Sequence, residues 1–324
     1  NQGNHMHLSL TERQEIIEEQ LSKKHINTKV LDDLTSDLDM MDKIIEGIEI
    51  LELWCNAPGE YESQQARKDH IKEMDLKDIV ETVYVTTLAL KNTTTLANLI
   101  GILSLKLEFE ESYQGFKAAG EIIALLCYTD VYDLDKPKKY DSIIVKPQFD
   151  LPEETKEYIE NAQYLPPSIC KPKYLMHNRS SGYRTIKRDS LILGGAIHHH
   201  NEDICLEVLN RMNETALELN QDMLSIQQEF EGDLDVIEDF EGSALEYQRA
   251  VSQQKENWEL FLRRSDLAYS IVEDNPFYLT HKIDKRGRIY SQGYAINVQG
   301  NSFQKASIDL VKKDYIEVPD DYFS

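Results

Sequence analysis

The 324-residue sequence predicts a mainly α-helical fold with a small β portion. Apolar residues recur at helical spacing through most of the first 130 positions and again between residues 202 and 272. Short runs typical of strands occur at residues 143–145, at 190–193 and after Phe277. The chain is long enough for two or three hydrophobic cores, and its 41% hydrophobic and 29% charged residues are an ordinary globular mixture.

The amino-terminal part is expected to be helical. Residues 1–6 look like the remnant of a purification tag and are left out of the fold, so the first domain is predicted to span 7–164. Ser9 and Glu12 form a capping box ahead of apolar residues at 16, 17 and 21. Pro58-Gly59 ends a helix whose apolar stripe, expected to be core, comprises Leu31, Leu34, Leu38, Met41, Ile45 and Ile48. Further helices are expected at 69–90, 95–109 and 115–128, and one begins at Pro152.

A basic, proline-rich extended segment is expected at residues 165–200. Between Leu165 and Gly195, six Lys and Arg residues stand against one Asp, a net charge of +5. Prolines and a Gly-Tyr pair exclude a long helix, and residues 190–193 are expected to form a strand. The ring of Tyr183 is expected to stack on a base, and cationic side chains to contact a nucleic-acid backbone, namely Lys171, Lys173, Arg184 and Arg188. The alternative is a proline-rich surface loop.

The sequence offers no clear metal site or redox centre. His198-His199-His200 lie near Asp203 and Cys205, but on a helix these donors would face several directions, so a polar helix start is the preferred interpretation. Four cysteines lie far apart with no Cys-x-x-Cys pair, which favours a reducing compartment over a disulfide framework. No long apolar run or signal peptide is present, so we expect a soluble protein without membrane contact.

Residues 201–275 are predicted to form a hairpin of two long helices. The first is expected at Glu202–Gln228, which carries an apolar face with interleaved asparagines, and the second at Ser243–Val272. Between them, residues 229–241 contain seven acidic residues and are expected to be an exposed linker or tip.

The last part, residues 276–324, contains the most informative stretch. Asp284 and Arg288 bracket a tight turn in which Gly287 permits a backbone that other residues avoid. Three cations lie within it, and an aromatic and aliphatic strand follows. A rigid Arg fork held by a carboxylate suits a phosphate, although a solvated basic hairpin would show the same residues.

The wider pattern resembles a known enzyme family. Asp-x-x-Gly-Arg-x-Tyr, then Gln299-Gly300-Asn301, then Lys305 and apolar residues at 308 and 310, resembles the start of the palm in single-subunit RNA polymerases of bacteriophages and mitochondria. The resemblance covers about Leu165 to Leu310, including the asparagine-rich helix that leads into the thumb. It implies contacts to the template or the RNA–DNA hybrid by Asp284, Lys285, Arg286, Gly287, Arg288, Gln299, Asn301 and Lys305.

The family's catalytic carboxylates and fingers helix would follow the Asp-x-x-Gly-Arg turn, and none of these motifs appears in the 36 residues after Arg288. The resemblance therefore implies a chain that has no catalytic residue of its own and binds no metal. It looks like the small, amino-terminal subunit of the two-subunit RNA polymerase of N-four-like phages. A second subunit would carry the catalytic palm, the fingers and the Mg²⁺ ions that two-metal nucleotidyl transfer requires. An artificially truncated polymerase is the other explanation.

Two functional hypotheses follow. The first is a non-catalytic but essential subunit of a phage DNA-dependent RNA polymerase, acting in the cytoplasm of the infected bacterium. Its partners would be the catalytic subunit, the DNA template and the RNA–DNA hybrid, and its amino-terminal helices would handle upstream DNA or a recruiting single-stranded-DNA-binding protein. The second is an acidic scaffold or regulatory protein that binds a transcription factor or host polymerase. A net charge of −23, with basic islands at 165–195 and 281–313, is compatible with either.

Overall fold

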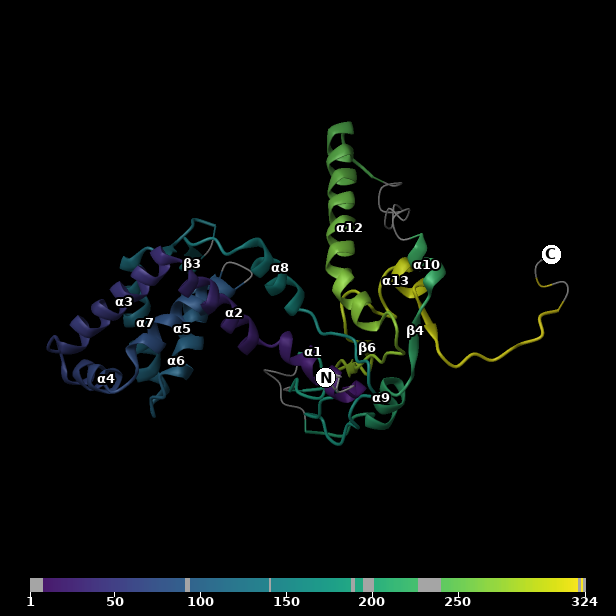
Figure 1. The fold of residues 1–324 in the computed structure, drawn as a ribbon, viewed down its shortest axis with the longest axis horizontal. Coiled ribbons are helices and arrows are strands. Elements are labelled where there is room, and N and C mark those ends of the chain that lie inside the picture. Colours follow the sequence, from purple (N-terminus) through teal and green to yellow (C-terminus); the bar gives the residue numbers. More distant parts are fainter. Residues whose placement is uncertain are drawn as a thin grey trace, which may run out of the picture. The chain divides into compact units, whose positions relative to one another are not determined.

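The chain forms two compact units, and the computed structural model describes residues 8–90, 94–139, 141–187, 190–194, 201–226, 240–319 and 322. One unit is Lys23–Glu160, and the other combines Asn1–Ser22 with Asn161–Ser324. The fold is mainly α-helical with a few short strands, as predicted (Figure 1). The expected first domain, 7–164, differs from this division because the first helix belongs with the carboxy-terminal part. None of the described helices is both long and apolar enough to cross a membrane.

The unit Lys23–Glu160 is a helical bundle with a small sheet. Its helices are α2 (Lys23–Ser36), α3 (Leu38–Asn56), α4 (Glu62–Lys72), α5 (Leu76–Ala89), α6 (Leu96–Lys106), α7 (Ser112–Leu126), the 3₁₀ turn η1 (Cys127–Thr129) and the start of α8 (Glu153–Ala162). Strands β1 (Thr94–Thr95), β2 (Tyr132–Asp135) and β3 (Ile144–Pro147) pair antiparallel in the order β1-β3-β2. The expected strand at 143–145 is confirmed as β3, which begins one residue later and ends two residues later, and the helix expected from Pro152 is confirmed as α8.

Two helical predictions in this unit need correction. Asp37 ends the expected long helix and starts α3, because its side chain accepts a hydrogen bond from the backbone N–H of Met40 at 3.0 Å. The buried stripe of α3 is Met40, Ile44, Gly47, Leu51 and Cys55, whereas Leu38, Met41 and Ile45 are exposed. The expectation that these three belong to the core is therefore wrong. The helix expected at 69–90 is two helices, because Asp75 caps the start of α5.

The other unit contains the segments for which nucleic-acid contacts were predicted. Its elements are α1 (Leu10–Gln20), α9 (Leu206–Asn213), β4 (Leu217–Leu219), α10 (Gln221–Ser225), α12 (Ala244–Val272), β5 (His281–Ile283), β6 (Ile289–Ser291), α13 (Ser302–Ala306) and β7 (Ile308–Leu310). β4 pairs antiparallel with β7, and β5 with β6. Phe277, Leu279, Ala295 and Ile296 form its buried core together with Val272 at the end of α12.

The continuous helix expected over Glu202–Gln228 is wrong. Among the described residues of this range, 202–226, only α9 and α10 are helical, and β4 separates them, because Leu217 and Leu219 pair with Leu310 and Ile308 from a distant part of the chain. The asparagines have separate structural roles: Asn220 caps α10 through a 3.0 Å hydrogen bond from the backbone of Met223, and Asn210 within α9 pairs with the backbone of Leu175. The second long helix is confirmed as the 29-residue α12, which stands out in Figure 1. Two paired long helices are therefore not present in the described residues, and residues 229–239 of the acidic segment 229–241 lie outside them.

The strand expected at 190–193 is also absent. These residues instead make a single parallel bridge between Ile192 and Ile283, with backbone hydrogen bonds from Leu193 to Ile283 and from Ile283 to Leu191. This contact extends the β5–β6 hairpin by a short third segment and connects it to the basic region of the chain.

Candidate nucleic-acid interface

The turn between β5 and β6 is built by hydrogen bonds that close on Asp284. Its backbone N–H donates to the carbonyl of Arg288 at 2.8 Å, and its carbonyl accepts from the N–H of Gly287 at 3.0 Å. Gly287 has a φ of 82°, a left-handed conformation that a residue with a Cβ adopts at a cost. A Cβ there would meet no atom within 4 Å, so the backbone conformation and not crowding explains the glycine.

The carboxylate of Asp284 organises the same turn from inside. One oxygen, Oδ1, accepts the backbone N–H groups of Arg286 and Arg288, both at 2.9 Å. The other, Oδ2, accepts the Arg288 Nε–H at 2.7 Å and the Tyr290 hydroxyl at 3.2 Å. Burial raises the pKa of this carboxyl, but the hydrogen bonds from Arg288 and Arg286 outweigh burial and lower the pKa to about 2. Asp284 is therefore an anion at neutral pH and holds both the turn and the Arg288 side chain.

The Arg288 guanidinium is bound through Nε, and the side chain is largely exposed to solvent. Asp284 takes its Nε–H, and the guanidinium carbon lies 5.8 Å from the centre of the Tyr290 ring. Its side chain is 60% exposed, and in the part of the chain that the structure describes no hydrogen bond occupies its two terminal nitrogens. Two parallel N–H donors in a fixed plane match the oxygens of a phosphate. The neighbouring Lys285 and Arg286 are exposed and add positive charge.

The Gln-Gly-Asn stretch behind the turn supports the hairpin. The side chain of Gln299 accepts the Ser291 N–H and donates to the Ile289 carbonyl, both at 2.7 Å, so it pairs with β6 like an extra strand residue. Asn301 caps α13 in a capping box with Gln304. Lys305 is exposed on α13. The structure gives the two amides a structural role, and their predicted contacts with a template stay predictions.

The basic segment at 165–187 is partly neutralised by acidic side chains. Lys171 Nζ lies 3.5 Å from a carboxylate oxygen of Glu214, and Arg184 Nε lies 3.6 Å from one of Glu15. Lys173 donates through Nζ to the carbonyl of Arg184 at 3.1 Å. These side chains keep partial exposure, so the predicted phosphate contacts remain predictions, while Arg188 lies outside the described residues.

Tyr183 corrects one expectation for this segment. Its ring is buried, and its hydroxyl donates to the carbonyl of Pro166 at 2.8 Å. A ring packed inside the unit has no free face for a base to stack on, so the predicted stacking role is wrong. Tyr183 instead connects the proline-rich segment at Pro166 to the loop that follows it.

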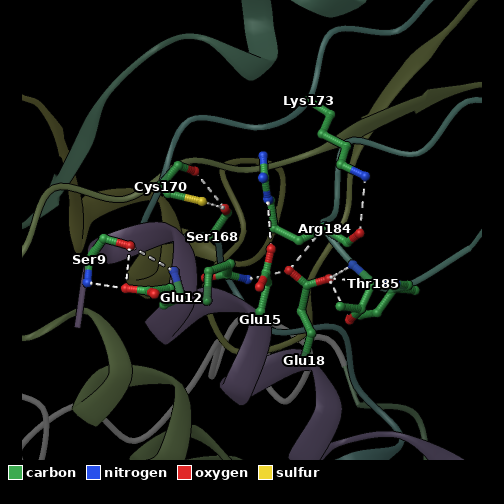
Figure 2. Close-up of polar contacts among 11 residues, drawn as sticks. Ser9, Glu12, Glu15, Glu18, Ser168, Cys170, Lys173, Arg184 and Thr185 are labelled. Atoms are coloured by element: carbon green, nitrogen blue, oxygen red, sulfur yellow. Dashed lines mark hydrogen bonds and ion pairs between the residues drawn. The ribbon is translucent and has the colours of Figure 1, made fainter.

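Two residues that the sequence did not single out hold the basic segment in place, and Figure 2 shows the contacts of one of them, Glu18. Gln14 and Glu18 on α1 are both completely buried, although glutamate is rarely so. The Glu18 carboxylate accepts the backbone N–H groups of Arg184, Thr185 and Ile186 at 3.1, 2.9 and 3.2 Å. It also accepts the Thr185 hydroxyl at 3.2 Å and the Gln14 amide at 3.0 Å. Three successive N–H groups converging on one anion form a backbone nest.

The Gln14 and Glu18 contacts could not be seen in the apolar pattern of α1. That pattern points to Ile16, Ile17 and Leu21, yet Ile16 is exposed. The capping box of Ser9 and Glu12 was predicted and is present, with the Ser9 N–H donating to Glu12 at 2.8 Å. Figure 2 shows Glu12, Glu15 and Glu18 following one another along α1, with Glu15 and Glu18 meeting Arg184 and Thr185.

A buried histidine on β5 connects the β5–β6 hairpin to α9. His281 on β5 shares a 2.8 Å hydrogen bond with the side-chain oxygen of Asn213 at the end of α9. Burial lowers the pKa of His281 to about 4, against a smaller raising effect of the Leu279 backbone, so the imidazole is neutral at pH 7. Among the described residues, no three His, Cys, Asp or Glu side chains are grouped to hold a metal ion, and His198–His200 lie outside them.

Comparison with known proteins gives one relevant similarity. A 151-residue stretch is 30% identical to a protein of Gelasinospora sp. (strain G114) described as a probable DNA-directed RNA polymerase. The match covers 44% of this chain and 17% of that protein, so the chain spans less than a fifth of its relative's length. No protein-family model matches the chain. The similarity supports a relationship to RNA polymerases.

Proposed function

We propose that this chain is a non-catalytic but essential subunit of a phage DNA-dependent RNA polymerase. It supplies the amino-terminal helices, a thumb-like helix and the β5–β6 turn, and a second subunit supplies the catalytic palm and fingers. The enzyme acts in the cytoplasm of the infected bacterium. The similarity to a probable DNA-directed RNA polymerase supports the class of enzyme.

The geometry of Arg288 is the observation that carries the proposal. Asp284 holds the guanidinium through Nε, and the Arg288 side chain is 60% exposed. A phosphate of the template or the hybrid would accept both terminal N–H groups, and Lys285 and Arg286 would add attraction that falls with salt. Because Asp284 accepts four hydrogen bonds within the turn, the fork is positioned before nucleic acid binds.

The role of this chain is to bind and orient nucleic acid. Mg²⁺ ions on the second subunit would supply the charge stabilisation for nucleotidyl transfer. Arg288 would hold the backbone of the bound strand, and the nest on Glu18 would keep the Arg184 loop in a fixed conformation. Arg288 takes no part in proton transfer, since its contact with Asp284 raises its pKa and the guanidinium stays protonated.

A second candidate function is an acidic scaffold that binds a transcription protein. The ion pairs of Lys171 with Glu214 and of Arg184 with Glu15 favour it, because they reduce the positive charge available to DNA. This candidate predicts no effect of the chain on RNA synthesis beyond recruitment.

Reconstitution separates the two candidates. The chain is purified with and without the catalytic subunit that co-purifies from its native source, and RNA synthesis is measured on a primed single-stranded DNA template with Mg²⁺. The polymerase proposal predicts a stable heterodimer whose synthesis neither chain shows alone. Full synthesis by the other chain in the absence of this one would refute it.

A further inference from the structure

The surface of α3 in the unit Lys23–Glu160 has a composition that the polymerase proposal does not explain. Four large apolar side chains point into solvent along this helix, with exposed fractions of 80% for Leu38, 41% for Met41, 52% for Ile45 and 73% for Leu53. Isolated exposed apolar residues are common, but a row of them along one helix marks an interaction surface. From Leu38 to Leu53 the row extends about 22 Å at the rise of an α-helix.

The same surface carries only negative charge. The five acidic residues of α3 are all exposed, namely Asp39, Asp42, Glu46, Glu49 and Glu52. Lys43 is the one cation of the helix, and its ammonium donates to the carbonyl of Thr129 at 2.7 Å inside the unit. A phosphate backbone or an anionic lipid surface would be repelled by this charge. The partner of this surface must therefore be cationic.

The exposed apolar side chains of α3 are not explained by loose packing of this helix. The opposite side of α3 is buried, with Leu51 fully enclosed and Gly47 so close to α5 that a Cβ would lie 2.8 Å from the Tyr84 hydroxyl. That hydroxyl donates to the carbonyl of Lys43 at 3.1 Å. The fold therefore fixes α3 in place and presents its apolar, acidic side as a rigid surface.

We propose that this side of α3 is a docking surface for a cationic amphipathic helix of a partner protein. Leu38, Met41 and Ile45 would contact the apolar side of that helix, and Asp42, Glu46 and Glu49 would pair with its Lys or Arg residues. This is the arrangement by which acidic helical surfaces bind basic amphipathic segments. The inference does not depend on the polymerase proposal, since it uses residues of the other unit alone.

Titration of the full chain with a synthetic peptide tests the inference. The probe is a fluorescent helical peptide of about 20 residues with Leu on one side and Lys on the other, followed by fluorescence anisotropy at about 50 mM salt. We expect saturable binding that weakens as salt rises. A scrambled peptide of the same composition, which has no apolar side, should bind at least roughly tenfold more weakly.

Paired substitutions locate the binding surface. Met41→Ser with Ile45→Ser should weaken peptide binding by roughly tenfold or more, because it removes the centre of the apolar row. Both positions are exposed, so the fold should survive, which far-UV circular dichroism checks. The matched control is Leu105→Ser on α6, which is 84% exposed in the same unit and should leave binding unchanged. Equal binding of the scrambled peptide, equal binding by the paired variant, or no saturable binding would each overturn the proposal.

Discussion

Removal of the Glu18 carboxylate should release the basic loop at 184–186 from α1. Glu18→Ala leaves three backbone N–H groups and the Thr185 hydroxyl without their acceptor. An unsatisfied buried donor costs about 1–3 kcal/mol, and the low end applies because Thr185 itself is exposed and water can reach it. Three N–H groups then give a destabilisation of the docked loop of about 3 kcal/mol.

Amide hydrogen exchange measures this loss where it occurs. The amides of Arg184, Thr185 and Ile186 should be protected in the wild-type chain and should exchange roughly a hundredfold faster in Glu18→Ala, as expected for about 3 kcal/mol. Glu18→Gln keeps one acceptor oxygen but not the charge, so its exchange should be intermediate.

Glu15→Ala is the matched control on the same helix. Its carboxylate is half-exposed and lies 3.6 Å from Arg184, a pair for which less than about 1 kcal/mol is expected. Exchange rates for residues 184–186 that are the same in Glu18→Ala and Glu15→Ala would refute the reasoning that the nest holds the loop.

Three further outcomes are expected. Protonation of His281 favours the unfolded chain, because its pKa of about 4 in the folded chain lies below the ordinary value of about 6.5. The contribution of His281 to stability is therefore complete above pH 6.5 and is lost as the pH falls toward 4, with a loss of about 2 kcal/mol at pH 5. Denaturant unfolding of His281→Gln at pH 7 and pH 5 should lack that difference in stability. Lys173→Ala should lower the salt dependence of binding to a single-stranded oligonucleotide by about one counterion. Lys171→Ala should lower it by less, since Glu214 already neutralises the charge of Lys171. Equal salt slopes for both variants and the wild-type chain would exclude phosphate contact by this segment. In the assembled enzyme, Arg288→Lys should restore only part of the synthesis that Arg288→Ala loses, because a point charge cannot replace a planar fork, and full restoration would show that charge alone suffices.

The sequence predicted the elements whose signals are local. The capping box at Ser9 starts α1, Pro152 precedes α8, and the Asp284–Arg288 turn joins two strands around a glycine of positive φ. These features depend on residues within about four positions of one another, so a pattern can specify them. The contact between Asp284 and Arg288 was predictable for the same reason, since the two residues are neighbours across one turn, while their contact with nucleic acid stays a prediction.

The features that the sequence did not predict depend on distant partners. β4 exists because Leu217 and Leu219 pair with a strand some 90 positions later, which overrides the helical pattern of the surrounding residues. Glu18 is buried because three N–H groups of a loop more than 160 positions away need an acceptor. Tyr183 is buried, and its hydroxyl donates a hydrogen bond to the carbonyl of Pro166. The basic, proline-rich sequence around Tyr183 does not indicate this contact.

We propose above all that the β5–β6 turn holds nucleic acid in the catalytic cleft of an RNA polymerase. Its most direct test is RNA synthesis by the reconstituted heterodimer carrying Arg288→Ala, on a primed single-stranded template, with subunit association checked in parallel. The matched control is Arg211→Ala, since Arg211 is an exposed arginine paired with Glu207 four positions earlier at 2.9 Å, as Arg288 is paired with Asp284 at 2.7 Å. We expect Arg288→Ala to lose about 2–4 kcal/mol of transition-state stabilisation and Arg211→Ala to be unaffected. Equal, near-normal synthesis by both variants would contradict the assignment of this turn to the active cleft.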